Sequence, residues 1–189
     1  VITHGMIREI PYVKFFKDPV NGIPYEMFKE DPSVEKLKSY CITKQDIQEH
    51  FAEKVEKKSK VTGHEKIVQA VINNEKNNYY WMTFSGGNMC LPKEWIQQVN
   101  GFDEKYCTNW GCEDCDLGYQ LMLKGYPFDY CDAAKNYHLD HYHANYVEQH
   151  KKNTSVFYEK HHDKSILWLQ EFVEGTIKSK ELIERILSN

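Results

Sequence analysis

The chain has 189 residues, of which 41% are hydrophobic and 14% aromatic, and its formal net charge is −4 at pH 7. This composition can supply a folded core, and no clustering of Lys and Arg indicates nucleic acid as a partner. The Lys-rich run 54–60 alternates with Glu and predicts a solvated helix surface. No apolar run approaches the roughly 18 residues needed to span a bilayer.

Six cysteines are spread through a chain whose apolar content does not require disulfides for folding. Reduced thiols in a cytoplasmic protein are therefore expected, with any membrane association supplied by parts outside this chain. Disulfides in an oxidising compartment stay open as the alternative, since an even count does not decide between the two. No secretory signal is visible at the N-terminus, although a chain that opens at Val1 says little on this point.

The first quarter of the chain predicts a strand, a turn-rich segment and a helix. Residues 1–9 are expected to form the strand, and the Pro-punctuated stretch 11–32 carries the turn signals. The helix begins near Thr43, because apolar residues follow it at helical spacing, namely Ile47, Phe51 and Val55.

The centre of the chain predicts two further helices around a short strand. A capping box at 62–65 opens the first of these helices, and residues 73–78 form the loop after it. The aromatic segment 79–84 predicts a strand, because aromatic residues are enriched in strands. A compact helix is expected within 92–101, since Pro is favoured at the first helical position and Gly just past the last.

The last part of the chain predicts a helix, two short strands and a helical end. The helix begins at the acidic pair 113–114 and stops at Gly125. The strands are expected at 126–132 and 136–139, and the chain is helical from about Val147. Strands and helices therefore mix in an α/β chain, but without the regular succession of βα units that builds a nucleotide-binding sheet.

The acidic pair carries the strongest indication of chemistry. Glu113 and Asp114 lie at a predicted helix N-terminus, where the helix dipole stabilises their anionic forms. A carboxylate beside an aromatic side chain such as Trp110 suits a general base that removes a proton from a hydroxyl. Plain helix capping is the alternative interpretation, and it is the commoner one for an acidic pair taken alone.

Three short segments follow one another at close spacing: Phe-Ser-Gly-Gly-Asn at 84–88, Gly-Phe-Asp-Glu at 101–104 and Trp-Gly-Cys-Glu-Asp at 110–114. Taken singly, they predict a tight turn, a helix stop and a helix cap. As an ordered set they resemble the C-terminal half of GT-A glycosyltransferases, specifically galactosyltransferase-like members of family 2 and their β-1,4-galactosyltransferase and polypeptide GalNAc-transferase relatives. The resemblance covers about residues 81–143, one third of the chain.

The resemblance implies an α/β fold, namely the acceptor-binding part of a GT-A (nucleotide-diphospho-sugar transferase) fold followed by C-terminal helices. It implies that three residues lie near the donor sugar: Gly86, Gly87 and Asn88. It also implies that four residues bind sugar and acceptor: Trp110, Gly111, Glu113 and Asp114. In an inverting member Asp114 would be the base, Glu113 would hold the acceptor and Trp110 would form the sugar wall.

The resemblance further implies a metal ion, because the leaving diphosphate needs Mn²⁺ or Mg²⁺ to neutralise its charge. One His ligand is expected downstream of the acidic motif, where the His-rich segment 137–143 lies. His138 is the first choice and His141 the second. On a strand His141 and His143 would share one face, while His138 would point to the other. A polar strand edge with hydrogen-bonded imidazoles is the alternative.

Such enzymes also carry an Asp-x-Asp at the end of a nucleotide-binding strand. The one candidate, 114–116, lies inside the acidic helix motif instead. We therefore expect residues 1–146 to form a partial glycosyltransferase domain that lacks its nucleotide-binding half, and 147–189 to form a helical extension. The expected partners are a UDP-sugar, a carbohydrate acceptor, and the missing half or other domains of a larger enzyme.

The expected function is metal-dependent transfer of a hexose or N-acetylhexosamine from a UDP-sugar to a sugar hydroxyl, as in polysaccharide biosynthesis. One alternative is a non-catalytic module that binds a glycan or a partner. Another is a zinc-stabilised domain, because Cys112 and Cys115 have the spacing of a zinc knuckle, and Cys107 with His138 could complete four ligands.

Overall fold

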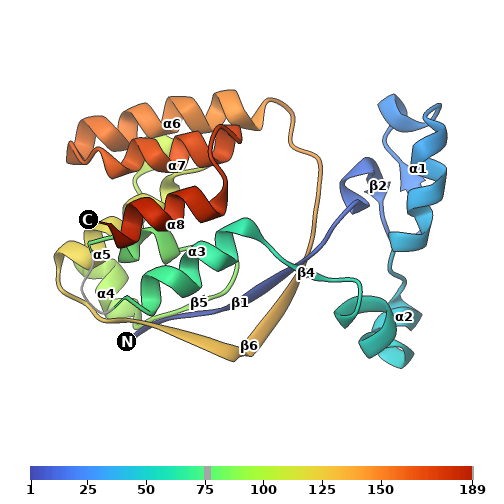
Figure 1. Ribbon diagram of the computed structural model, residues 1–189, viewed down its shortest axis with the longest axis horizontal. Helices are drawn as coiled ribbons and strands as arrows, with labels where there is room; N and C mark the ends of the chain where they lie inside the picture. Colours follow the sequence, from blue (N-terminus) through green and yellow to red (C-terminus); the bar gives the residue numbers. More distant parts are fainter. Residues whose placement is uncertain (75–77, 189) are drawn as a thin grey trace. The chain divides into compact units, whose positions relative to one another are not determined.

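The computed structural model describes residues 1–74 and 78–188 and has a mixed α/β architecture, as the sequence predicts (Figure 1). It divides into two compact units, which we describe separately. The larger unit comprises Val1–Met6, Gly63–Ala134 and Asn145–Asn189, and the smaller unit comprises Ile7–Thr62 and Lys135–Ala144. In the described part of the chain, no helix is both long enough and apolar enough to cross a membrane.

The strands of the larger unit confirm one expected element and correct another. Strand β1 (Ile2–Ile10) forms where 1–9 predicts it, and its first residues pair antiparallel with β5 (Met89–Cys90). Strand β6 (Phe128–Leu139), which also pairs with β1, is continuous, so the prediction of two separate strands is wrong. Its 12 residues contain neither Gly nor Pro, so nothing interrupts the extended backbone.

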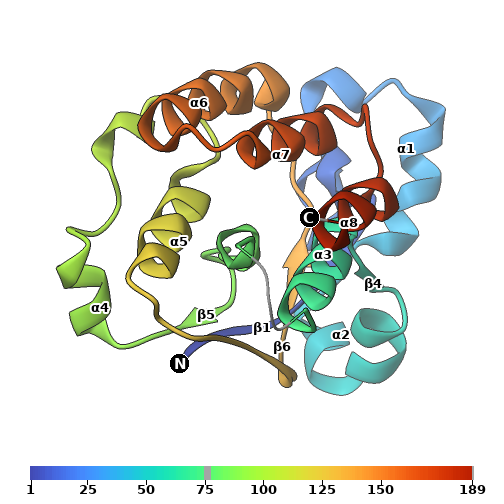
Figure 2. The same ribbon diagram turned by 60° about the vertical axis from the view of Figure 1, so that its left-hand side comes forward.

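Six α-helices lie in the described residues of the larger unit, and the predicted starts near 63, 93, 113 and 147 are confirmed. They are α3 (Gly63–Ile72), α4 (Lys93–Gln98), α5 (Glu113–Leu123), α6 (Tyr146–His161), α7 (Ser165–Glu174) and α8 (Ser179–Leu187). Helices α6 and α7 run side by side, and α8 lies against α3 (Figures 1 and 2). The short 3-10 helix η6 (Glu104–Tyr106) precedes the acidic motif.

The main core of the larger unit joins its centre to its C-terminal helices. Trp81 is fully buried, with its ring edge-on to Phe157 of α6 at 5.2 Å and tilted against Tyr119 of α5 at 5.8 Å. Ile166 of α7 and Leu182 of α8 are buried in the same cluster. Because these helices bury their apolar faces in this core, the C-terminal helices belong to the same compact unit as residues 63–134. The assignment of residues 1–146 to a partial domain stays a prediction.

The expected strand at 79–84 is wrong, because Tyr80–Thr83 forms a 3-10 helix, η5. Four consecutive side chains from Trp81 to Phe84 are buried, whereas a strand exposed on one face would bury alternate ones. Burial on all sides thus overrides the strand preference of the aromatic residues. The loop expected at 73–78 lies partly outside the described residues, which omit 75–77.

Glu65, the acidic residue of the capping box expected at 62–65, is buried near the start of α3. Its carboxylate is 1% exposed, and Oε2 lies 3.2 Å from Nε2 of the fully buried His4. The hydroxyl of Tyr130 on β6 donates to Oε1 at 2.7 Å. The side chain therefore links α3 to β1 and β6 inside the larger unit, where hydrogen bonding offsets the cost of burying a carboxylate.

The smaller unit is built from short elements around a small core. Its strands are β2 (Phe16–Asp18) and β3 (Ile23–Pro24), which pair with each other, and β4 (Lys60–Val61), which pairs with the end of β1. Its helices are η1 (Val13–Phe15), η2 (Glu26–Phe28), α1 (Pro32–Leu37), η3 (Lys38–Tyr40), α2 (Lys44–Glu49) and the π-helical turn η4 (Ala52–Glu56). The core consists of Ile10, Val13, Ile42 and Val55.

The helix expected near Thr43 is confirmed at its start and is shorter than its apolar pattern suggests. Thr43 and Asp46 form a capping box, and α2 ends at Glu49. The π-helical turn that follows changes the direction of the side chains. Val55 is therefore buried, whereas Ile47 is 50% and Phe51 39% exposed, so the three do not share one buried face.

We expect Gly118→Ala to destabilise the protein although Ala favours helices by about 1 kcal/mol over Gly. A Cβ at this position of α5 would lie 2.4 Å from Cβ of Phe84 and 3.1 Å from the carbonyl oxygen of Trp81. Overpacking of this kind costs about 1–3 kcal/mol, so the urea midpoint should fall. Leu123→Ala, at a side chain of α5 that is 67% exposed, is the control. An unchanged midpoint in Gly118→Ala would show that η5 does not pack tightly on α5.

Candidate active site

Helix α5 begins at Glu113, as predicted, because the two preceding residues turn the chain sharply. Gly111 has φ +93° and Cys112 has φ +72°, and left-handed backbone of this kind favours glycine. A Cβ on Gly111 would also lie 2.6 Å from Cδ2 of His150. The glycine of the motif is therefore required by the backbone and by the His150 ring of α6.

Asp114 and Gly86, which are 28 residues apart in sequence, meet in the structure. The backbone N–H of Gly86 donates to Oδ2 of Asp114 at 2.8 Å. A Cβ on Gly86 would lie 3.0 Å from Oδ1 of the same carboxylate, so a larger residue would crowd it. Burial raises the pKa of Asp114, and the hydrogen bond from Gly86 offsets only part of that rise.

Glu113 lies beside this pair with an incompletely satisfied carboxylate. Its Oε2 is buried and has no hydrogen-bond partner among the described residues. Burial raises the pKa of Glu113, and repulsion from Asp114 adds to the effect. Desolvation thus acts against the helix N-terminus, whose expected stabilisation of both anionic forms stays a prediction.

Trp110 stands next to this acidic pair in sequence and is 40% exposed. Its backbone N–H donates to Oε1 of Gln149 at 3.0 Å. Its ring packs edge-on against Tyr146 and tilted against His150, with both centroid distances at 5.8 Å. An exposed aromatic face held in this way can stack on a sugar ring.

The loop that carries Trp110 is held by α6, a support that the motifs do not indicate. The buried Asn153 side chain donates to three backbone carbonyls, those of Tyr106, Asn109 and Gly111, the last at 2.7 Å. His150 lies one turn earlier, with Nδ1 2.5 Å from Oε1 of Gln170. His150 and Asn153 are three residues apart on α6, so they lie on the same face of the helix. Polar residues at this spacing are the sequence signal that could have indicated the support of the Trp110 loop.

Asn88, expected near the donor sugar, has its side-chain amide bound to backbone. Its Nδ2 donates to the carbonyl of Ala134 on β6 at 2.7 Å and to that of Met6 on β1 at 3.2 Å. Gly87, also expected there, is exposed. The amide of Asn88 therefore joins β1 to β6, and its contact with a donor stays a prediction.

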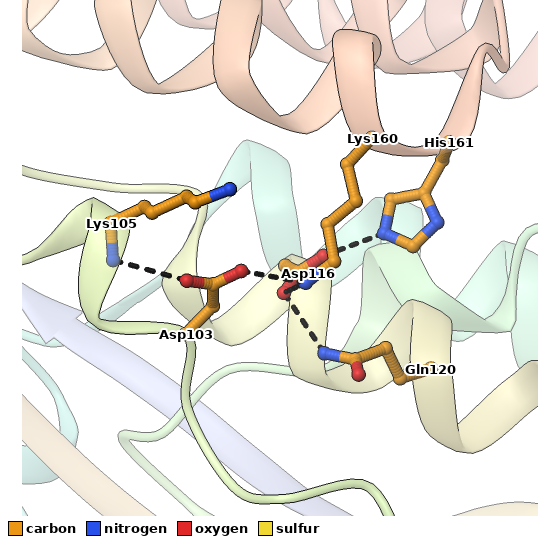
Figure 3. Close-up of polar contacts among 6 residues, drawn as sticks. All are labelled: Asp103, Lys105, Asp116, Gln120, Lys160 and His161. Carbon is orange, nitrogen blue, oxygen red and sulfur yellow. Dashed lines mark hydrogen bonds and ion pairs between the residues drawn. The ribbon is translucent and has the colours of Figure 1, made fainter.

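Asp116, two residues after Asp114, is the centre of a buried ionic cluster (Figure 3). Its side chain is 1% exposed, with Oδ1 2.6 Å from Nε2 of His161 and Oδ2 2.8 Å from Nζ of Lys160. The Gln120 amide donates to Oδ2 at 3.0 Å. Lys160 also reaches Asp103, the N-cap residue of η6, at 2.9 Å, so Lys160 links this residue to the Asp116 carboxylate of α5.

This cluster explains why the Asp-x-Asp letters at 114–116 do not form a metal motif. The Asp116 carboxylate is already bound by an ammonium, an imidazole and an amide. Burial alone would lower the pKa of Lys160. Its hydrogen bonds to Asp116 and Asp103 raise the pKa by more than burial lowers it, so the net shift is upward. The lysine therefore stays charged at neutral pH and compensates the buried carboxylate.

The zinc alternative finds no support in the geometry of its ligands. In residues 1–74 and 78–188 no three or more His, Cys, Asp or Glu side chains are placed to hold a metal ion. Cys107 is exposed, whereas Cys112 is buried with Sγ 3.6 Å from Nε2 of His150. Burial raises the pKa of Cys112 to about 12 and that of Cys115 well above its usual range.

The predicted metal ligands lie in the smaller unit. His138 is on β6, which ends at Leu139, so His141 and His143 lie beyond the strand and the expected facing pattern is wrong. The rings of His138 and His141 are nevertheless adjacent, with centroids 5.2 Å apart, and those of His141 and His143 are 4.3 Å apart. Partial burial, and then His141, lowers the pKa of His138 and favours its neutral form.

Replacing Asp116 tests the ionic cluster. We expect Asp116→Asn to lower the free energy of unfolding by about 3 kcal/mol, because Lys160 would lose its buried counter-charge and His161 a carboxylate partner. Asp129→Asn, at an exposed aspartate of β6, is the matched control and should leave the urea midpoint unchanged. Equal midpoints for the two variants would contradict the role given to the cluster.

A pair of glycine substitutions separates backbone strain from crowding at the motif. Gly125 has φ +76°, and a Cβ added there would meet nothing within 4 Å, so Gly125→Ala should cost only the left-handed strain, about 1–2 kcal/mol. Gly111→Ala also meets the His150 ring and should cost about 1–3 kcal/mol more. Urea denaturation of both variants measures the difference, and equal losses would refute the contact.

Comparison with known proteins places this site in context. Residues 66–144 match the family described as the N-terminal domain of galactosyltransferase. Chondroitin synthase of Pasteurella multocida (strain Pm70) is 44% identical over 57 residues, 30% of this chain and 6% of that protein. Chondroitin synthase of Escherichia coli is 40% identical over 57 residues, 30% of this chain and 8% of that protein.

Hyaluronan synthase of Pasteurella multocida is 36% identical over 57 residues, again 30% of this chain and 6% of the relative. The chain thus matches only 6–8% of the length of these three relatives. All three are named as polysaccharide synthases, and the family match spans the Gly86, Trp110 and Asp114 segments together. Residues 66–144 are therefore a GT-A glycosyltransferase-like region, as their ordered motifs indicate.

Proposed function

We propose that this chain supplies the acceptor-binding and catalytic part of an inverting glycosyltransferase. The enzyme would transfer a hexose or N-acetylhexosamine from a UDP-sugar to a sugar hydroxyl. The observation that carries the proposal is the partly buried Asp114 carboxylate, which Gly86 holds through one oxygen. A base with a raised pKa is better matched to accepting a proton near neutral pH than an ordinary aspartate.

The proposed step is a single displacement at the anomeric carbon. Oδ2 of Asp114 accepts from Gly86, which leaves Oδ1 to take the proton of the acceptor hydroxyl. The hydroxyl oxygen then forms the new bond to the anomeric carbon while the bond from that carbon to the diphosphate oxygen breaks. The nucleoside diphosphate leaves with the electron pair, and the configuration at the carbon inverts.

The residues around Asp114 receive supporting roles in this proposal. The exposed face of Trp110 would stack on the acceptor sugar, and Oε2 of Glu113 would accept from an acceptor hydroxyl and so gain the partner it lacks among the described residues. The bare backbone at Gly86 and Gly87 would admit the donor sugar. Chondroitin and hyaluronan synthases are named for polysaccharide products, which favours a carbohydrate acceptor here.

A metal ion and a nucleotide-binding part belong to the proposal as well. Mn²⁺ or Mg²⁺ would neutralise the charge of the leaving diphosphate. The described residues do not form a complete ligand set, so His138 and His141 are proposed as two ligands and no step is assigned to the ion. We propose that the nucleotide-binding half, or other domains of a larger enzyme, supply what remains of the donor site.

Asp114→Asn should separate catalysis from stability. Loss of the base should reduce the transfer rate about 10²–10⁴-fold. Because burial raises the folded-state pKa of Asp114, the ionised group lowers stability once the pH rises through that pKa. The variant should therefore unfold at a higher urea concentration than the native protein at pH 7, and this advantage should vanish in acid, where Asp114 is protonated.

The rates are measured in the full enzyme with UDP-hexoses and UDP-N-acetylhexosamines as donors and chondroitin or hyaluronan oligosaccharides as acceptors. Asp132→Asn, at an exposed aspartate of β6, is the control. Native turnover in Asp114→Asn would refute the base assignment. Acceptor binding by the native enzyme without any transfer would instead support a non-catalytic glycan-binding module.

A further inference from the structure

The smaller unit contains a hollow of about 660 Å³ that plays no part in the proposed transfer step. Its lining residues, which we call the lysine hollow, are Tyr40, Glu53, Lys54, Lys57, Lys58 and Lys60. Four lysines and one glutamate give this lining a formal charge of +3, in a chain whose net charge is −4. The hollow is therefore a local concentration of positive charge in a chain whose net charge is negative.

Among the described residues, the four ammonium groups lack the ion-pair partners that some other lysines of the unit have. Lys29 pairs with Glu26 at 2.5 Å and Lys38 with Glu35 at 2.7 Å. Among the residues described, none of the four lysines of the hollow forms an ion pair. Their mutual repulsion is therefore only weakly relieved, and an anion in the hollow would relieve it.

Lys58 is the most constrained of the four. Its Nζ donates to the carbonyl of Ser39, and it lies 5.8 Å from the ring centroid of Tyr40. Burial lowers the pKa of Lys58, and the charge of Lys54 lowers it further, whereas Asp46 acts in the opposite direction. The ammonium is thus held in place beside a like charge, which is the arrangement of a site for a negative ligand.

Aromatic rings accompany the charges on one side of the hollow. Tyr40, which lines it, packs edge-on against Tyr12 with centroids 4.7 Å apart. Lys60 lies 5.1 Å from the ring centroid of Tyr12. A ligand in the hollow would therefore meet an aromatic ring together with several ammonium groups.

The π-helical turn at η4 produces this arrangement from a sequence that predicts an ordinary solvated helix. Val55 is turned into the core, and Ser59 is buried and accepts from the side chain of Arg8 at 2.7 Å. The lysines on either side of Val55 and Ser59 therefore line one concave surface instead of being spread around a helix. Within the run 54–60, Lys54 lies in η4, whereas Lys57, Lys58 and Lys60 follow it, and all four lysines line the hollow.

We propose that the lysine hollow binds an anionic polysaccharide, that is, a chain of sugar rings that carry carboxylates. The lining residues of the hollow include lysines, which act as separate point charges, and no arginine. Arginine is the side chain whose paired N–H groups suit a compact phosphate. The volume lies within the range of sites for ligands larger than a diphosphate. Tyr40 offers a ring on which a sugar can stack while the ammonium groups meet its carboxylates.

Binding of a polygalacturonate decamer, measured by calorimetry on the full chain, tests the proposal. Maltodecaose is the neutral probe of equal length, and pyrophosphate and a single-stranded DNA decamer are the phosphate probes. We expect the polygalacturonate to bind most tightly, with an affinity that falls as salt is added. The variant Lys54→Gln/Lys57→Gln/Lys58→Gln/Lys60→Gln should weaken this binding at least about tenfold, because four charge pairs are lost.

The matched control removes the same charge from the larger unit, at the exposed lysines Lys93, Lys124, Lys151 and Lys152, each changed to Gln. The affinity of this control variant for polygalacturonate should lie within about twofold of that of the native chain. If the loss of Lys58 unfolds the protein, the triple variant that retains Lys58 provides the same comparison. Equal weakening in control and test variants, or tighter binding of DNA or pyrophosphate than of polygalacturonate, would overturn the proposal. Neither result depends on whether the enzyme transfers sugar.

Discussion

Asp116 places a carboxylate in the interior of the larger unit, where a charge without a partner would cost several kcal/mol. Lys160 and His161 at the end of α6 supply the compensating groups, and Lys160 extends the cluster to Asp103. Because these groups come from α5, α6 and the N-cap residue of η6, one buried charge fixes the relative position of the elements on either side of the acidic motif. The Trp110 loop, which Asn153 of the same α6 holds by hydrogen bonds, depends on that position.

The cost of burying a carboxylate has a different outcome at Asp114, two residues before Asp116. Asp114 is partly buried, but the group that donates to its carboxylate is the backbone N–H of Gly86, which is neutral. Because this donor does not offset the loss of hydration, the carboxylate has a raised pKa and therefore a higher affinity for a proton. Neighbouring carboxylates on one helix thus divide into a group that holds the structure and a group equipped to accept a proton.

Part of this site could be predicted from sequence, because its motif segments follow one another in a recognisable order within residues 84–114. The start of α5 at Glu113 follows from glycine and helix-capping rules, whereas the contact between Gly86 and Asp114 is seen only in the structure. The raised pKa values of Glu113 and Asp114 could not be predicted, since burial depends on contacts distant in sequence. For the same reason, the aromatic segment predicts a strand where Tyr80–Thr83 forms a 3-10 helix, and sequence does not identify Asp116 as a partner of Lys160.

The pH dependence of sugar transfer by the native enzyme tests the central claim most directly. If the partly buried Asp114 is the base, kcat/KM should fall as the pH is lowered through its raised pKa, and this acid limb should lie above the usual range for an aspartate. The account predicts that the limb disappears when Asp114 is replaced by Asn, leaving a low rate that varies little with pH. A profile that is flat down to the ordinary aspartate range, or an acid limb that persists in Asp114→Asn, would contradict it.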